Sequence, residues 1–207
     1  MRVIRTRGDD DGGGDYATGA LGQRLAARGL GGVELVVSDD HAGLVAAIRE
    51  VLPGAAWHRC YVHFLRNALD HLPRKADDDC LQELRWMYDR RDLAEVRRDL
   101  AQWLARWQAK YPKLCAWVED NIEETLTFYR LPRAHHKHLK STNMLERLNQ
   151  EIKRRTQVVR IFPNTESCLR LVRALAVETH ENWLEAIRYL NMEHLKEHKK
   201  EALRAAA

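Results

Sequence analysis

The sequence STNMLERLNQEIKRR, which spans Ser141–Arg155, organises the rest of the chain. It predicts a helix, because Ser, Thr and Asn at its start are typical caps and because Leu145, Leu148 and Ile152 recur at the spacing of one buried stripe. The opposite face carries Glu146 near amide and ammonium side chains at helical spacing. A carboxylate in these surroundings is suited to bind a metal ion or to lie beside a phosphate.

Glu146 also has a purely local interpretation. Asn143 and Glu146 have the spacing of a capping box, in which the carboxylate bonds the backbone at the start of the helix. Spacing alone does not choose between a cap and a functional carboxylate, so both interpretations stand at this point.

Positive charge gathers around this helix. Residues 130–160 hold nine Lys and Arg against two Glu, a net +7, whereas the whole chain carries +4. Within them, Leu131–Lys140 is predicted as a basic, His-rich loop suited to phosphate contacts, although a solvated linker has the same composition. The candidate DNA-binding residues are Arg133, Lys137, Lys140, Arg147, Lys153, Arg154 and Arg155.

The totals bound the class of protein. A chain of 207 residues with 45% hydrophobic residues suits one domain, or one domain with a helical insertion. No apolar run reaches membrane-spanning length, and the N-terminus has a Gly/Asp cluster where a signal peptide has an apolar core. The four cysteines, at positions 60, 80, 115 and 168, are scattered as reduced thiols rather than spaced as a disulfide framework. We therefore expect a cytoplasmic protein without a membrane partner.

The first part of the chain predicts little regular structure. Residues 1–15 combine three Arg, four Asp and four Gly with few apolar residues, so we expect them to be disordered. A short helix is predicted over Tyr16–Arg28, with Gly29 at its end. The segment Val33–Val37 is then the first convincing strand.

A carboxylate follows that strand directly. Asp39 lies just past its end, where backbone groups hold a charge at the rim of a sheet while solvent or a metal ion still reaches it. The alternative is that Asp39 or Asp40 caps the next predicted helix, His41–Leu52.

A Cys-x2-His motif lies in the next predicted element. The segment Ala55–Asn67 is predicted to begin as a strand and to continue as a helix. Cys60 and His63 have the spacing of half a zinc site, for which His135 and His138 offer two further ligands. The alternative is a buried cysteine packed beside a hydrogen-bonded histidine.

Amphipathic helices dominate the remainder. Residues 65–131 predict a helical insertion whose Trp side chains belong to the core, and residues 16–64 predict the part that holds the sheet. Residues 132–195 predict core helices with a break at Pro163, and residues 196–207 a frayed helical tail. The whole pattern predicts an α/β fold that is mostly helical.

Three separated motifs resemble the Mutator-type transposases of bacterial insertion sequences. They are the segments Val36–Leu44, Trp57–His63 and Ser141–Arg155, and the similarity runs in one order from about Leu21 to Leu195. The resemblance implies a partial RNase H-like, retroviral-integrase-like core, interrupted by an all-helical insertion.

The resemblance also implies a chemistry. Asp39 corresponds to the second carboxylate of the family's catalytic DDE triad and Glu146 to the third, and both are then expected to hold Mg²⁺ or Mn²⁺. Cys60 and His63 match a Cys-x2-His signature of the family. The implied partner is DNA, as terminal inverted repeats and target, with a nucleoid-associated location.

The chain departs from the family at its start. The first catalytic Asp and the DNA-binding region that precede Tyr16 in the family have no counterpart in residues 1–15, so we expect the C-terminal part of a DDE transposase that is inactive alone. The alternative function is a non-catalytic DNA-binding or assembly fragment that pairs with itself or with full-length transposase. A third hypothesis is a small zinc-stabilised helical protein.

Overall fold

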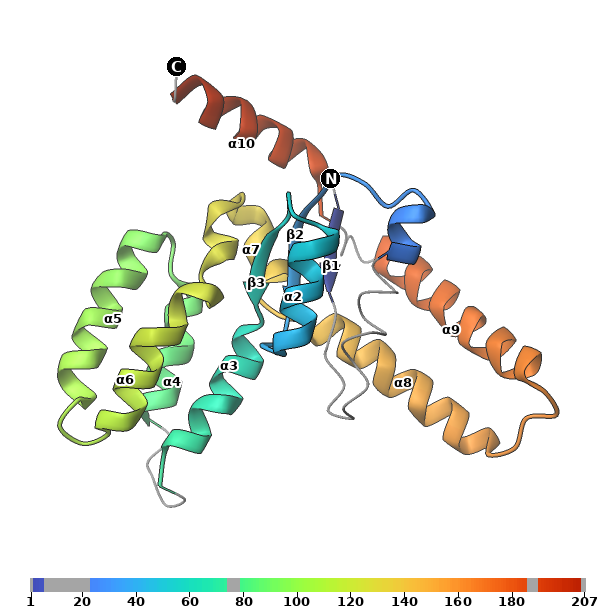
Figure 1. Cartoon of the computed structure of the whole chain (residues 1–207), viewed down its shortest axis with the longest axis horizontal. Helices are drawn as coiled ribbons and strands as arrows, with labels where there is room; N and C mark the ends of the chain where they lie inside the picture. Colours follow the sequence, from blue (N-terminus) through green and yellow to red (C-terminus); the bar gives the residue numbers. More distant parts are fainter. Residues whose placement is uncertain (1, 6–22, 74–78, 186–189, 206–207) are drawn as a thin grey trace. The chain divides into compact units, whose positions relative to one another are not determined.

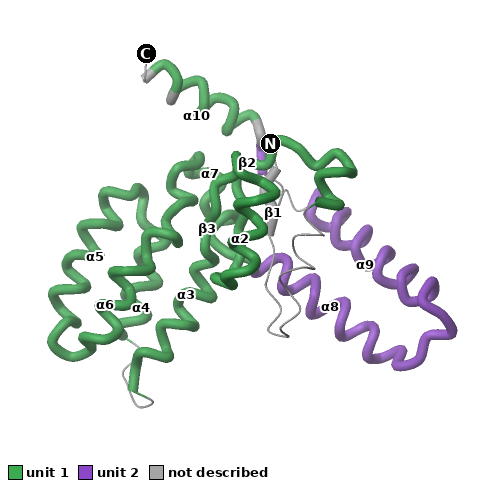
Figure 2. Tube along the Cα trace, in the orientation of Figure 1, with its two compact units in different colours: residues 1–142, 192–207 green, residues 143–191 purple. Residues whose placement is uncertain are grey.

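The computed structural model describes residues 2–5, 23–73, 79–185 and 190–205 of the chain. The chain forms two compact units, one of residues 1–142 with 192–207 and one of residues 143–191 (Figure 2). The segment 132–195, predicted as one group of core helices, is therefore divided between the two.

A parallel sheet forms the first part of unit 1. Its strands are β1 (Arg2–Arg5), β2 (Val33–Ser38) and β3 (Ala56–Arg59), hydrogen-bonded in the order β1-β2-β3 (Figure 1). Both neighbouring pairs are parallel. The predicted α/β class is confirmed, because helices make up most of the rest.

The helix α2 (Ala42–Val51) connects β2 to β3 and packs on the sheet. Parallel neighbours need such a crossover, and the apolar side chains of α2 meet those of β2 to form a small core. The buried members of this core are Val33, Val36, Leu44 and Ile48.

The N-terminal prediction is wrong in part. Arg2–Arg5 lies within the segment expected to be disordered, yet it pairs along β2, since an open edge of β2 supplies the backbone partners that a strand needs. The rest of that segment, residues 6–15, lies outside the described residues.

The predicted helix before β2 is confirmed where it is described, at residues 23–27. Gly29 ends it with a φ of +84°, the left-handed conformation that glycine adopts most easily. The Gly29 N–H donates to the Ala26 carbonyl and the Leu30 N–H to the Leu25 carbonyl, both at 2.9 Å. These two bonds are those of a Schellman motif.

The predicted helical insertion is confirmed and packs on the β3 side of the sheet (Figure 1). Its Trp side chains belong to the core, as predicted, and Trp103 Nε1 donates to the Cys80 carbonyl at 2.8 Å. From the helix that follows β3 to the end of the insertion, the elements are α3 (Tyr61–Ala68), η1 (Leu69–His71), α4 (Asp79–Trp86), η2 (Met87–Asp89), α5 (Leu93–Trp107), α6 (Pro112–Asn121), η3 (Ile122–Thr125) and η4 (Thr127–Arg130).

The segment predicted as a basic loop is a helix. α7 covers Arg133–Leu139, and the prediction was wrong because it weighted the charges and overlooked two buried positions one turn apart, His135 and Leu139. His136 Nε2 also bonds the Leu131 carbonyl at 2.7 Å, which closes the start of the helix.

Unit 2 is a pair of helices, α8 (Asn143–Val159) and α9 (Thr165–Glu185). The predicted break between them is confirmed. Asn164 caps α9, because its Oδ1 accepts from the Ser167 N–H at 2.9 Å.

The C-terminal helix α10 (Met192–Ala205) belongs to unit 1. The frayed tail predicted from residue 196 is wrong up to Ala205. Leu195 is buried and Lys199 forms an ion pair with Glu34 of β2, so the helix has an apolar and a charged contact with unit 1. Among the helices that the structure describes, none is long and apolar enough to cross a membrane.

The buried His58 makes the stability of the fold depend on pH. Burial lowers the pKa of His58 from 6.5 to about 4, against the opposing effect of backbone hydrogen bonds with Lys140 and Glu124. Between pH 6.5 and about pH 4, His58 is therefore protonated in the unfolded chain and neutral in the folded chain. We expect the free energy of unfolding to fall by about 3 kcal/mol as the pH drops through this window, and to be unaffected by His58 above it.

Urea denaturation at a series of pH values checks this prediction. The variant His58→Gln cannot titrate, so its stability should fall less between pH 6.5 and 4 than that of the unmodified chain. Equal slopes for the two proteins would contradict the prediction.

Candidate active site at the carboxyl end of the sheet

The backbone at the carboxyl end of β2 is held by residues of β3 and the residue after it. Ser38 donates its hydroxyl to the Asp39 carbonyl at 2.7 Å, and Trp57 Nε1 donates to the same hydroxyl oxygen at 2.8 Å. The Cys60 N–H donates to the Ser38 carbonyl at 2.7 Å. Asp39 therefore extends from a fixed main chain, and the residue is half-buried.

The residue that caps α2 is His41. Its Nδ1 accepts from the Leu44 N–H at 3.4 Å, whereas the sequence offered Asp39 or Asp40 for this role. That alternative is wrong, because the helix begins at Ala42 and the cap is the residue directly before it.

Asp40 has a different partner, the buried guanidinium of Arg59 at the end of β3. Arg59 Nη1 lies 2.8 Å from Asp40 Oδ2, 3.2 Å from Asn121 Oδ1 and 3.7 Å from Glu124 Oε2. Burial, and next the nearby negative charge of Asp40, raise the pKa of Glu124, while Arg59 acts in the opposite direction. The guanidinium thus joins the carboxyl end of the sheet to the helical insertion.

Aromatic rings complete the surroundings of this charge. The guanidinium carbon of Arg59 lies 5.5 Å from the ring centroids of both Phe64 and Trp117. The two rings stack on each other with centroids 4.8 Å apart. Arg59 was not among the predicted site residues, because its only local signal was a charged residue inside an apolar strand pattern.

Cys60 and His63 form a buried pair. The Cys60 thiol accepts from the Thr142 N–H at 3.4 Å and from the Thr142 hydroxyl at 3.5 Å. Burial raises the pKa of this thiol, but hydrogen bonds with His63 and Thr142 outweigh it and the net shift is downward. The burial of both residues agrees with the alternative of a buried cysteine packed beside a histidine.

The residues that the structure describes give the zinc hypothesis no support. Within the described ranges, no three residues of the types His, Cys, Asp and Glu come together as a metal site. His135 instead packs on His194, with ring centroids 6.2 Å apart.

Glu146 lies in the first turn of α8, and its side chain is half-buried. It belongs to unit 2, whereas Asp39 belongs to unit 1. Carboxylate oxygens are the ligands that Mg²⁺ prefers, and both side chains are partly exposed, so each suits a metal ion chemically. Their pairing on one ion stays a prediction, as does the capping role of Glu146.

The predicted basic residues have different surroundings. Arg133 and Lys137 are exposed on α7. Lys140 is mostly buried, with its Nζ 2.5 Å from Asp89 Oδ1 and 5.4 Å from the ring centroid of Tyr61. Its positive charge is therefore already used within unit 1.

On α8 the side chains of Arg147, Lys153, Arg154 and Arg155 are exposed. Arg154 and Arg155 both contact Glu151 at 2.7 Å, and their hydrogen bonds lower the pKa of Glu151 to about 2. Glu151 thus stays charged near neutral pH and offsets part of the positive charge on this helix.

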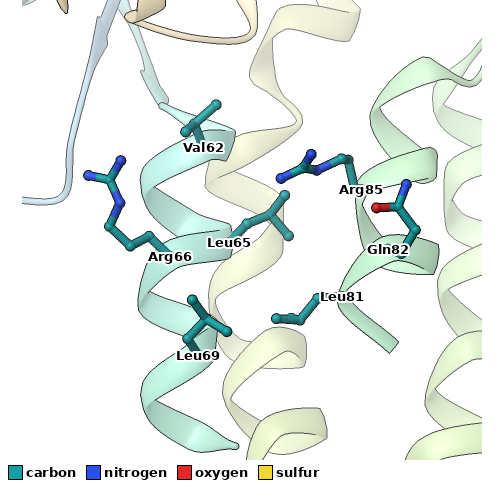
Figure 3. A pocket seen from close by; sticks show the side chains of 7 residues that line it. All are labelled: Val62, Leu65, Arg66, Leu69, Leu81, Gln82 and Arg85. Carbon is teal, nitrogen blue, oxygen red and sulfur yellow. The ribbon is translucent and has the colours of Figure 1, made fainter. Parts of the chain in front are cut away.

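A groove of about 360 Å³ separates α3 and α4 in unit 1 (Figure 3). Apolar side chains form much of its lining, together with the polar groups of two arginines and one glutamine. None of the predicted site residues lines it. The lining residues are Val62, Leu65, Arg66, Leu69, Leu81, Gln82 and Arg85.

Comparisons with known proteins give one consistent result. A family model described as "Transposase, Mutator family" matches residues 17–186. The chain is 79% identical over 184 residues to the transposase for insertion sequence element ISRM5 of Rhizobium meliloti, which covers 89% of this chain and 46% of that relative.

Two further relatives are more distant. The chain is 45% identical to the transposase for insertion sequence element IS406 of Burkholderia multivorans, over 82% of this chain and 44% of the relative. It is 39% identical to the transposase for insertion sequence element IS256 in transposon Tn4001 of Staphylococcus aureus, over the same two shares, 82% and 44%. The chain therefore spans less than half the length of these curated relatives.

The contacts of Arg59 predict a large effect of its removal. Arg59→Ala should lower the free energy of unfolding by about 3 kcal/mol or more, because it leaves a cavity beside the two stacked rings and removes the partner of Asp40. Urea denaturation measures this change.

Arg91→Ala is the matched control, since Arg91 is exposed and pairs with Asp92 at the surface. It should change the free energy of unfolding by about 0.5 kcal/mol or less. A similar cost for both variants would rule out a structural role for the buried guanidinium.

Proposed function

The chain belongs to the Mutator family of transposases, and on that premise we propose that it supplies part of a DDE active site for DNA cleavage and strand transfer. The observation that carries the proposal is the position of Asp39, whose main chain is fixed at the carboxyl end of the parallel strand β2 by Ser38, Trp57 and Cys60. Carboxyl ends of parallel strands are where α/β proteins hold their reacting groups.

The proposed fold is an RNase H-like core with a helical insertion between its second and third carboxylates. Three features support it: the parallel order β1-β2-β3, the crossover helix α2, and the run of helices between β3 and α8. Asp39 and Glu146 are then the second and third carboxylates of the triad.

The residues of this chain have distinct tasks in the proposed mechanism. Asp39 and Glu146 would hold Mg²⁺ or Mn²⁺ through their carboxylate oxygens. When bound, such ions activate a water or a 3′-hydroxyl and stabilise the leaving oxygen in an in-line phosphodiester transfer. Arg59 pairs with Asp40, so the neighbour of Asp39 does not add an uncompensated negative charge to the site.

DNA is the proposed partner, as terminal inverted repeats and as target. The exposed basic side chains of α7 and α8 suit contacts with phosphate. Binding to DNA would bring the protein to the nucleoid in the cytoplasm.

An alternative function is a non-catalytic fragment that binds DNA or assembles with itself or with full-length transposase. Its support is helix α8, whose exposed basic side chains suit DNA binding without any catalytic role. Two results together would favour this alternative. The chain would bind DNA, and removal of Asp39 or Glu146 would not reduce cutting.

The catalytic proposal is tested in a longer protein. Residues 17–186 of this chain would replace the matching part of the Rhizobium meliloti transposase, and cleavage of terminal inverted-repeat DNA would be measured with Mg²⁺ or Mn²⁺. Asp39→Asn and Glu146→Gln should each lower the cleavage rate by at least about a hundredfold, because each removes an anionic metal ligand.

The matched controls are Asp120→Asn and Glu119→Gln, which change exposed carboxylates on α6. They should leave the cleavage rate unchanged. A chimera that cuts equally well with and without the two site carboxylates would refute the assignment.

The charge balance on α8 gives a second test with two opposite signs. Glu151→Gln should strengthen DNA binding, because it releases Arg154 and Arg155, whereas Lys153→Gln should weaken it. The plot of log affinity against log salt should become steeper for the first variant and shallower by about one unit for the second.

Fluorescence anisotropy with labelled duplex DNA measures both effects, by comparison of each full-length variant with the unmodified chain. The exposed pair of α10 offers a control, because Glu193→Gln frees Lys196 in the same way without touching α8. If Glu151→Gln and Glu193→Gln changed the affinity equally, α8 would not be the DNA contact.

A further inference from the structure

The backbone directly before α8 is held by the junction between β3 and α3. The Lys140 carbonyl accepts from the Tyr61 N–H at 3.2 Å and bonds His58 Nε2 at 3.3 Å. One carbonyl oxygen thus joins Lys140 to the junction between β3 and α3, although His58 lies 82 positions earlier in the sequence.

Cys60 makes the next contact along the same path. Its thiol accepts from the Thr142 N–H and from the Thr142 hydroxyl, and both residues are fully buried. His63 forms a hydrogen bond with the same thiol. The bond from the Thr142 N–H thus gives a buried backbone donor an acceptor directly before a helix.

The same residue also contacts the segment of the second carboxylate. The Cys60 N–H donates to the Ser38 carbonyl at 2.7 Å, and Ser38 directly precedes Asp39. Thr142 directly precedes α8, in whose first turn Glu146 lies. Cys60 therefore contacts one residue near each of the two carboxylates.

We propose that Cys60 and Thr142 are positioning residues of the transposase reaction. Together with the bonds to Lys140 they form a latch, defined as Cys60, His58 and Tyr61 with Lys140 and Thr142. The latch holds Thr142, the residue directly before α8, to the residue that also bonds the Ser38 carbonyl at the end of β2. This inference rests on the proposed function, because it assigns the latch the task of positioning the segments next to Asp39 and Glu146 for the reaction.

A thiol suits this task for two reasons. Sulfur accepts hydrogen bonds yet packs as a small apolar group in a buried site. A C–O bond is also shorter than a C–S bond, so a serine at position 60 would hold its oxygen farther from Thr142. Cys60→Ser is therefore expected to loosen the latch although it retains a polar atom.

Hydrogen exchange, measured without metal on the full chain and on its variants, tests the latch itself. Cys60→Ala should raise the exchange rate of the Thr142 amide and of the first turn of α8 by about tenfold or more, because the acceptor is lost. Cys115→Ala is the matched control, since it deletes an equally buried thiol in α6. The control should leave exchange in these residues unchanged.

Single-turnover cleavage by the chimera tests the positioning role. Cys60→Ala and Thr142→Val should each lower the rate constant at saturating DNA by about tenfold or more and raise the Mn²⁺ concentration for the half-maximal rate. The DNA dissociation constant should not change. Thr142→Ser keeps the hydroxyl and should restore most of the rate, and the double variant should be no worse than either single one.

Two results would overturn the inference while the proposed function stands. In the first, Asp39→Asn and Glu146→Gln abolish cleavage but Cys60→Ala behaves like Cys115→Ala. In the second, Cys60→Ala and Thr142→Val reduce the rate in simple addition, which would mean separate effects. If Asp39→Asn and Glu146→Gln leave cleavage intact, the proposed function falls and the positioning role with it, and the exchange rates then report on the latch alone.

Discussion

The buried guanidinium of Arg59 is the interaction on which the architecture of unit 1 depends. A charge removed from water is costly unless it finds partners, and no single element offers enough of them. Asp40 follows β2, Asn121 ends α6 and Glu124 lies in η3, so the charge is satisfied only when the sheet and the insertion fold against each other. The helical insertion is thereby part of the sheet's own support.

Three residues at the end of β3 make separate contacts at the carboxyl end of β2. Trp57 orients the Ser38 hydroxyl, Arg59 pairs with Asp40, and Cys60 bonds the Ser38 carbonyl. Each acts on a different atom of one short segment. A half-buried carboxylate at such a place extends from a main chain whose position is fixed.

Local patterns predicted the elements and missed the long-range partners. Apolar periodicity was enough for β2, α2, the insertion and the break before α9, because these depend on neighbours in sequence. It failed at α7, where charge concealed a buried stripe, and at Arg2–Arg5, which is ordered only by pairing with β2. The contact of Cys60 with Thr142 joins residues 82 positions apart, and nothing in either local sequence indicates it.

The hydrogen bonds at the Ser38 and Asp39 carbonyls involve main-chain atoms of this segment, and this has an evolutionary consequence. A codon change at Asp39 alters the proposed metal ligand and leaves the carbonyls of Ser38 and Asp39 available for the same hydrogen bonds. A gene copy that loses this carboxylate can still encode a folded chain with its basic surface. Such inherited silent copies would persist as competitors for the same sites, and selection on folding alone would not remove them.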